Sequence, residues 1–296
     1  MKNLKKLALL GLTAAMSLSL LAGCGSGTTG NAETPDANSS APVTESQAPA
    51  ETTPAATGEF TTVEAGKLIM STNAQFPPYE MVGDGEGYEG TGYEGIDVEI
   101  AYAIAEKLGL ELVVDNMGFD AALQAVQTGK SDIVMAGVTV TDDRLEVMDF
   151  SDTYANGIQV VIVPENSDIA TIDDLEGKLI GCQMGTTGYI YCSDTPENGG
   201  YGEDAVIPYD DGAAAIQALM NGQVDCVVID NAPAQEYVKA NPGLKILDTE
   251  FANENYAIGF AKGNTALKDA VNAALIELVE DGTVQSIIDK YIPAEG

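Results

Sequence analysis

Histidine and tryptophan are absent from this sequence, and basic residues are scarce. Without histidine there can be no Ser-His-Asp triad, no histidine general base and no typical zinc site. The 13 lysines and arginines face 46 aspartates and glutamates, so the formal net charge is -33. A nucleic-acid partner is excluded, because there is no basic surface to displace the counterions of the phosphates.

Apolar runs long enough to span a membrane are also missing from the sequence. The longest candidate, Leu7–Leu21, follows three lysines and has the length and layout of a secretory signal. It ends in Leu-Ala-Gly-Cys at Cys24, which resembles a bacterial lipobox; an ordinary signal with a chance cysteine is the alternative. We therefore expect a signal peptide at 1–23 and a lipid on Cys24 that anchors the protein to a membrane outside the cytoplasm.

The segment 24–59 is expected to be a disordered tether. It consists largely of Ser, Thr, Pro, Ala, Gly and acidic residues, with no basic or aromatic residue. Such a composition cannot bury enough apolar surface to offset the entropy of ordering. The folded part should begin at Phe60 and is long enough for two modest lobes.

Three cysteines remain beyond Cys24, namely Cys182, Cys192 and Cys226. An odd number of thiols cannot all pair within the chain. Cys182 and Cys226 lie in apolar, strand-like runs and are expected to be small core residues; a disulfide among the three stays open.

Strand and helix patterns alternate, which is typical of the α/β class. Lys67–Thr72 and Leu110–Val114 read as strands. Asp97–Leu108 has apolar residues on one helical face and is closed by a glycine. Asp120 is expected to cap a short helix that stops at Gly129.

The segment 122–137 is repeated at 215–230, with six of sixteen positions identical. Both copies read as a helix, a glycine stop, an aspartate and a buried strand, which indicates two similar lobes. Ligands of open α/β sheets bind beyond the carboxyl ends of the strands. Gly137 and Asp230 end the two copies and are therefore candidate site residues on facing lobes.

An ordered series of short motifs then identifies a family resemblance. The motifs are Phe76–Glu80, Gly95–Asp97, Ala136–Thr139 followed by Arg144, Asp149–Ser151, Gly185–Gly188, Asp230–Ala234 and Asp281–Thr283. This series resembles the polar amino-acid-binding proteins of bacterial ABC importers. The resemblance implies the type II periplasmic-binding-protein fold, with two Rossmann-like lobes joined by two hinge strands near Tyr154–Gln159 and Asn253–Ile258. Lobe 1 would comprise 60–156 plus 255–296, and lobe 2 would comprise 157–254.

An α-amino acid presents a carboxylate and an ammonium, and a closed site must supply a partner for each. From spacing alone, Arg144 could either grip a carboxylate or pair with the neighbouring acids at 142, 143 and 146. The resemblance assigns it the ligand carboxylate. Thr139, Gly137, Thr186 and Thr187 are expected to help it with hydroxyl or backbone donors.

Asp230 is assigned the ligand ammonium by the same resemblance, although its position before a helix also suits an N-cap. The resemblance places Asn73, Phe76, Phe119 and Gln183 around the ligand side chain. Relatives that prefer cationic ligands often have an acid at the position of Asn73, so a neutral polar amino acid is favoured here, unless Glu80 restores a negative charge.

The sequence thus predicts an extracytoplasmic lipoprotein that captures a free L-amino acid and delivers it to an ABC permease. It is expected to be monomeric, with no catalytic residue, cofactor or metal. The acidic loop 83–95 lacks the ligand order of an EF-hand and reads as solvated rather than as a calcium site. A sensor or docking module, or a secreted dehydratase on the same fold, are the alternatives.

Overall fold

The computed structural model describes residues 60–293, which form a mixed α/β structure. The strands are β1 (Lys67–Thr72), β2 (Gln75–Phe76), β3 (Glu80–Val82), β4 (Tyr93–Glu94), β5 (Glu111–Asn116), β6 (Ile133–Val134), β7 (Met148–Pro164), β8 (Ile180–Gln183), β9 (Val206–Tyr209), β10 (Cys226–Asp230), β11 (Leu244–Ile246) and β12 (Ala252–Ala261). The α-helices are α1 (Ile96–Leu108), α2 (Phe119–Gln127), α3 (Asp142–Val147), α4 (Thr187–Ser193), α5 (Gly212–Met220), α6 (Asn231–Ala240), α7 (Thr265–Glu280) and α8 (Thr283–Tyr291). Short 3₁₀ helices lie at Tyr88–Gly90, Ile172–Leu175, Pro196–Asn198 and Glu203–Ala205.

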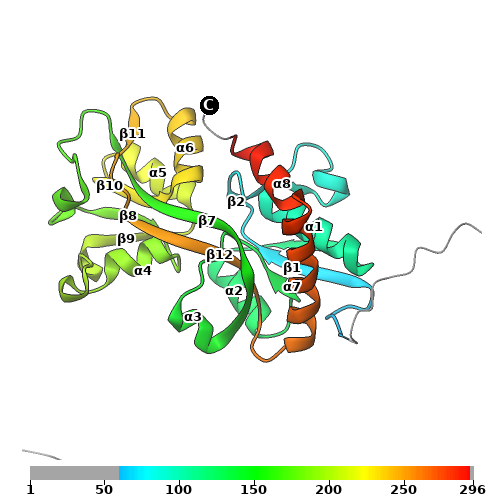
Figure 1. The fold of residues 1–296 in the computed structure, drawn as a ribbon. Coiled ribbons are helices and arrows are strands. Elements are labelled where there is room, and N and C mark those ends of the chain that lie inside the picture. The colour runs from blue at the N-terminus through cyan, green and yellow to red at the C-terminus, as the bar shows by residue number, and fades with distance from the viewer. Residues whose placement is uncertain (1–59, 294–296) are drawn as a thin grey trace, which may run out of the picture. The chain divides into compact units, whose positions relative to one another are not determined.

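The main sheet has the strand order β5-β1-β6-β12-β7-β10-β8-β9, with β11 added to β7. Parallel pairs lie at both ends of this order, β1 with β5 and β6, and β8 with β9 and β10. The long strands β7 and β12 run antiparallel between them and link two groups of elements (Figure 1). The strand order and the hydrophobic cores separate these two groups, which are called lobes below. The first lobe comprises β1–β6, α1–α3, α7 and α8, and the second comprises β8–β11 and α4–α6.

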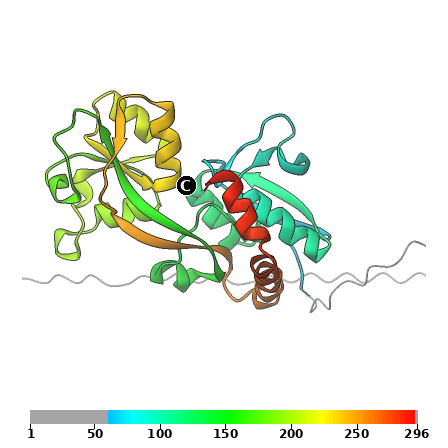
Figure 2. The same ribbon diagram turned by 45° about the horizontal axis from the view of Figure 1, so that its top comes forward.

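The two predicted crossings pair with each other. The register runs from Ala252 opposite Gln159 to Tyr256 opposite Ala155, so both crossings are extended and antiparallel. Figure 2 shows β7 and β12 as a two-stranded ribbon between the lobes. A ribbon of this kind can bend without breaking either core, which suits a hinge.

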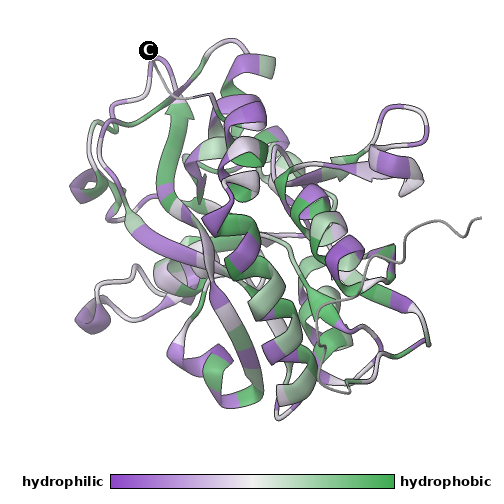
Figure 3. Cartoon of the chain, turned by 45° about the vertical axis from the view of Figure 1, so that its right-hand side comes forward, coloured by the Kyte–Doolittle hydropathy of each residue, from purple (hydrophilic) through white to green (hydrophobic). Residues whose placement is uncertain are grey.

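Hydrophobic residues fill both faces of the sheet in each lobe. Along β7, Val160 and Ile162 belong to a core with α5 and α6, whereas Val161 and Val163 belong to a core with Cys182 and Cys192. This alternation follows from the two-residue period of a strand and explains the uninterrupted apolar run. Figure 3 shows hydrophobic residues along such strands and both classes of residue on the covering helices.

The sequence repeat is a structural repeat. Helix α2 with β6, and helix α5 with β10, are the same unit in the two lobes. Its shared aspartate has the same role in both copies: Asp132 accepts from the backbone N–H of Ile69 at 2.8 Å, and Asp225 accepts from that of Leu179 at 2.8 Å. The aspartate therefore ties each repeat to the neighbouring strand, which is a structural reason for its presence in both.

The predicted cap at Asp120 is wrong. Helix α2 begins one residue earlier, at Phe119, and its N-cap is the extended residue Gly118. Phe119 is the first residue of α2, and its side chain is buried in the same core as Leu123 and Val126 of that helix. The Asp120 carboxylate instead lies against Gly185 of the other lobe, in the space that a β-carbon there would need.

Cys182, Cys192 and Cys226 are free and buried, so the disulfide left open is absent within the described residues. Among residues 60–293, no helix is long and apolar enough to cross a membrane. The signal peptide at 1–23, the lipid on Cys24 and the tether 24–59 all lie outside the described residues.

Candidate functional site

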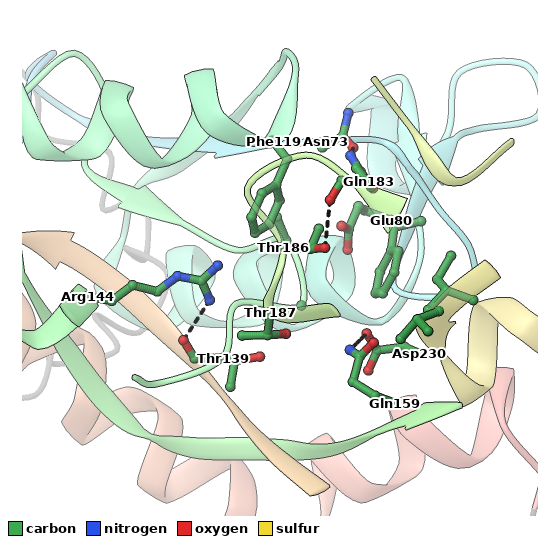
Figure 4. Close-up of a pocket in the computed structure, with 15 residues that line it drawn as sticks. Asn73, Glu80, Phe119, Thr139, Arg144, Gln159, Gln183, Thr186, Thr187 and Asp230 are labelled. Atoms are coloured by element: carbon green, nitrogen blue, oxygen red, sulfur yellow. Dashed lines mark hydrogen bonds between the residues drawn. The ribbon is translucent and has the colours of Figure 1, made fainter. Parts of the chain in front are cut away.

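A cleft between the lobes holds about 470 Å³ of empty space, counting the part open to solvent. All ten residues predicted to contact a ligand line it, and Figure 4 shows most of their side chains pointing into one space. The predicted set is Asn73, Phe76, Phe119, Gly137, Thr139, Arg144, Gln183, Thr186, Thr187 and Asp230. Five further residues line the cleft: Glu80, Ala136, Gln159, Val228 and Ile229.

Arg144 is the only arginine in the sequence and is 7% exposed. It sits in the first turn of α3, where its backbone N–H donates to the hydroxyl of the N-cap residue Thr141 at 3.2 Å. Its guanidinium donates to the carbonyl of Thr139 at 2.8 Å and to that of Gly185, in the other lobe, at 3.2 Å. Burial lowers the pKa of Arg144, and the negative charge of Glu254 opposes that effect.

The alternative pairing of Arg144 with its acidic neighbours is not found. Within residues 60–293, no carboxylate lies close enough to Arg144 to form an ion pair. The guanidinium packs 5.5 Å from the centre of the Phe119 ring instead. A guanidinium has five N–H donors, so several stay available after the two backbone contacts. Arg144 can therefore receive a planar anion.

Asp230 is 7% exposed at the end of β10, where it precedes α6. It occupies the N-cap position, but its side chain makes no capping bond. The carboxylate instead accepts from the hydroxyl of Tyr256 and, at 2.5 Å, from Nε2 of Gln159. Burial, followed by the charge of Glu254, raises the pKa of Asp230 well above its usual value. A cation placed here would reverse that shift.

Gly157 makes the contact between Asp230 and Tyr256 possible. A β-carbon at Gly157 would lie 2.6 Å from Oδ1 of Asp230 and would also collide with the Tyr256 hydroxyl. Gly157 lies on β7, Tyr256 on β12 and Asp230 on β10. Position 157, where the two hinge strands and the second lobe meet, therefore requires a residue without a side chain.

The turn 185–188 contributes its residues through the start of α4. Thr186 is the N-cap: its hydroxyl donates to the Gln183 carbonyl at 2.8 Å and accepts from the Tyr189 N–H at 3.3 Å. Thr187 follows at the first helical position and is buried. Gln183 reaches across the cleft and donates to Oδ1 of Asn73 at 2.9 Å, so the two predicted side-chain contacts lie next to each other.

Glu80 is the buried acid that faces the cleft from β3. It is 0% exposed; its carboxyl lies against that of Asp97, and neither of its oxygens accepts from any other donor among the described residues. Burial raises the pKa of Glu80 well above its usual value, and the nearby charge of Asp97 adds to the shift. Asp97 itself accepts from the Gly137 N–H at 2.9 Å and the Tyr154 hydroxyl at 2.8 Å, and burial raises its pKa to about 6.

Sequence reasoning missed three polar residues of the hinge strands. Gln159 lines the cleft, while Glu254 and Tyr256 contact residues that line it. The available signal was weak: a glutamine and a glutamate inside extended segments that are otherwise read as connectors. Their burial, 2% exposure for Gln159 and 4% for Glu254, becomes visible only when the lobes are placed together.

Comparison with known proteins gives consistent matches over the described part of the chain. The probable histidine-binding protein of Neisseria gonorrhoeae is 34% identical over 236 residues, 78% of this chain and 85% of that protein. The L-cystine-binding protein TcyJ of Escherichia coli K12 is 32% identical over 235 residues, again 78% and 85%. The structure of the arginine-, lysine-, histidine-binding protein ArtJ from Geobacillus stearothermophilus matches with 33% identity and a TM-score of 0.69, covering 78% of this chain and 96% of that one.

The fold shared with these structures is the type II periplasmic-binding-protein fold, as the motif series predicted. The family model that describes bacterial extracellular solute-binding proteins, family 3, matches residues 68–294. The family consists of binding proteins rather than enzymes. Together with the two lobes and the polar cleft between them, this match shows that the chain belongs to the family 3 extracellular solute-binding proteins of bacteria.

Proposed function

We propose that this protein captures a free α-amino acid in the cleft between its lobes and delivers it to an ABC importer. The observation that carries the proposal is the convergence of Arg144, from the first lobe, and Asp230, from the second, on one buried cleft. Arg144 would bind the ligand carboxylate and Asp230 the ligand ammonium. Thr187 and the backbone at 138 and 139 would add donors on the carboxylate side, whereas the Thr186 hydroxyl and the Gly137 N–H already donate to Gln183 and Asp97.

Ligand binding and lobe closure are linked in this scheme. Each zwitterion end left unpaired in a buried site would cost several kcal/mol, so only a closed cleft with both partners in place holds the ligand tightly. The ligand then stabilises the closed form by its higher affinity for that form. We place the lobe boundaries at 60–156 plus 255–296 and at 157–254, which puts both crossings in the paired stretch of β7 and β12.

The buried carboxylate of Glu80 favours a cationic side chain over the neutral one expected from Asn73. Glu80, Asp230 and Glu254 are all buried in or beside the cleft, whereas Arg144 is the one cation in its lining. A zwitterion adds no net charge to this set, but an arginine or lysine side chain adds one positive charge. The unpartnered oxygens of Glu80 would accept from that group. The relatives named for arginine, lysine and histidine support the same class.

A thermal-shift panel of the twenty amino acids and cystine tests the function. A ligand present at a hundred times its Kd stabilises the folded state by about 2.7 kcal/mol, so tight ligands stand out. We expect arginine or lysine to raise the melting temperature most. Asp230→Asn should abolish the shift, whereas Asp204→Asn, the same change at an exposed acid of the second lobe, should leave it unchanged. A panel in which no amino acid shifts the wild type would refute the proposal.

The lipid anchor remains part of the proposed function. Family membership places the protein outside the cytoplasm, and Cys24 would hold it at the membrane surface through two or more acyl chains. The wild type should then sediment with membranes, and Cys24→Ser should appear in the soluble fraction. Equal sedimentation of both proteins would contradict the anchor without affecting amino-acid binding.

A further inference from the structure

Glu254 is a buried acid that the proposed ligand contacts do not use. It lies on hinge strand β12, is 4% exposed, and is hydrogen-bonded to two residues that line the cleft. Burying a carboxylate is costly unless it is hydrogen-bonded. Both bonds end on Oε2 of Glu254, whereas Oε1 is buried without a hydrogen-bond partner among the described residues.

The first bond fixes the direction in which the Thr139 hydroxyl donates its hydrogen. Its hydroxyl donates to Oε2 of Glu254 at 2.9 Å. A hydroxyl has a single hydrogen, so Thr139 Oγ1 cannot also donate to a ligand carboxylate. Its lone pairs remain, and Thr139 lines the cleft. The sequence-based expectation of a hydroxyl donor to the carboxylate is therefore not favoured by this geometry. Thr139 Oγ1 is available as an acceptor.

The second bond fixes the orientation of the Gln159 side-chain amide. Its Nε2 donates to Oδ2 of Asp230 at 2.5 Å and to Oε2 of Glu254 at 3.1 Å, which uses both amide hydrogens. Because both neighbours are carboxylates, which accept hydrogen bonds, the amide must point its nitrogen rather than its oxygen toward them. Oε1 of Gln159 is consequently an acceptor, and it is buried without a hydrogen-bond partner among the described residues.

We propose that Glu254 is a positioning residue that makes the cleft selective for a primary ammonium. By accepting the hydrogens of Thr139 and Gln159, it leaves an acceptor oxygen on each of these residues, in the cleft lining that also contains Asp230. A primary ammonium has three N–H donors and can satisfy three acceptors, whereas an α-hydroxyl has one donor and leaves buried acceptors unpaired. This inference rests on the proposed capture of an amino acid and adds how its ammonium is distinguished.

A competing role for Glu254 predicts that the affinity of the Glu254→Gln variant changes in the opposite direction. Its charge acts on Arg144 more strongly than any other acid does. If Glu254 served mainly as the counter-ion of Arg144 in the empty cleft, removing its charge would free the guanidinium and tighten ligand binding. The direction of the change in affinity therefore separates the two roles.

The test compares L-arginine with argininic acid, its α-hydroxy analogue, by titration calorimetry with wild type and Glu254→Gln. The variant keeps the size of the side chain but loses its charge, and its amide can donate back toward Thr139. We expect L-arginine affinity to fall about 10- to 100-fold and argininic acid affinity to stay within about threefold. Glu250→Gln, the same change at an exposed position just before β12, should alter neither.

An equal loss of affinity for both ligands would mean that Glu254 only supports the fold. A gain in affinity for L-arginine would favour the counter-ion role. Either result would overturn the proposal, and so would unchanged affinities for both ligands. If Glu254→Gln does not fold, Thr139→Val provides the same comparison and should also lose L-arginine selectively. A wild type that binds no amino acid would instead refute the proposed function. If the wild type prefers another amino acid, that amino acid and its α-hydroxy acid replace the pair.

Discussion

Replacing Arg144 by alanine should weaken amino-acid binding by about two to four decades, because the ligand carboxylate would be buried without a partner, at a cost of about 3–5 kcal/mol. No second cation can take over, since Arg144 is the one basic residue in the described lining of the cleft. The guanidinium is 7% exposed, so solvent does little to screen its charge.

The alanine variant has a second effect that must be separated from the first. Arg144 donates to the carbonyls of Thr139 and Gly185, which would lose a partner. Stability should therefore fall by about 1–3 kcal/mol for a carbonyl that stays buried and unpaired. Arg144→Lys retains the positive charge but loses the planar guanidinium that can bind a carboxylate through two parallel hydrogen bonds, so we expect an intermediate loss of affinity.

Titration calorimetry with the best ligand of the panel measures the affinities, and circular dichroism melts measure the stability. Lys130→Ala is the matched control, because Lys130 is an exposed cation in the first lobe. Binding by Arg144→Ala within about threefold of wild type would refute the assignment of the carboxylate to Arg144.

Glu80→Gln should lower the affinity for L-arginine by about tenfold or more and change that for L-glutamine far less, as competitive titrations would show; equal losses would exclude a charge-specific role. Gly157→Ala should lower both melting temperature and affinity, because its β-carbon would lie 2.6 Å from Oδ1 of Asp230 and against Tyr256; a melt and titration indistinguishable from wild type would contradict this. Burial raises the pKa of Asp97 in the folded state to about 6, against 3.8 in the unfolded chain, and raises the pKa values of Glu80 and Asp230 well above normal. These shifts stabilise the empty protein most at low pH. The contribution of Asp97 is lost as the pH rises through about 6, and those of Glu80 and Asp230 are lost as the pH rises through their own raised pKa values. A ligand ammonium requires ionised Asp230, so the ligand-induced rise in melting temperature should be larger at about pH 8 than at about pH 5, and a larger shift at the lower pH would contradict this.

Local sequence patterns predicted the helices and strands whose positions depend mainly on residues near in sequence. The first strand matched at Lys67–Thr72, and the helix predicted at 97–108 was found at Ile96–Leu108, because hydrophobic periodicity and a terminal glycine define such elements. The repeat predicted two similar lobes for the same reason. Asp120 failed as a cap because tertiary packing of Phe119 decided where the helix begins.

The cleft depends on contacts that no local pattern contains. The family resemblance, rather than any local pattern, named ten residues that line it. Residues that act through others escaped notice, because Gln159 and Glu254 gain their partners from segments about 71 and 115 positions away. A glutamate in an extended connector looks like a solvated residue until the opposite lobe covers it.

Both ends of the described chain leave from the first lobe. Phe60 and the last residues of α8 pack on the same core as α1 and α7, whereas the second lobe is reached only through β7 and β12. The second lobe is thus an insertion whose own ends never reach a terminus. A tether at either terminus would restrain one half of the molecule and leave the other free to swing. A biosensor could accordingly be immobilised by its C-terminus, with a dye attached at the exposed position 204 of the second lobe to report movement of that lobe.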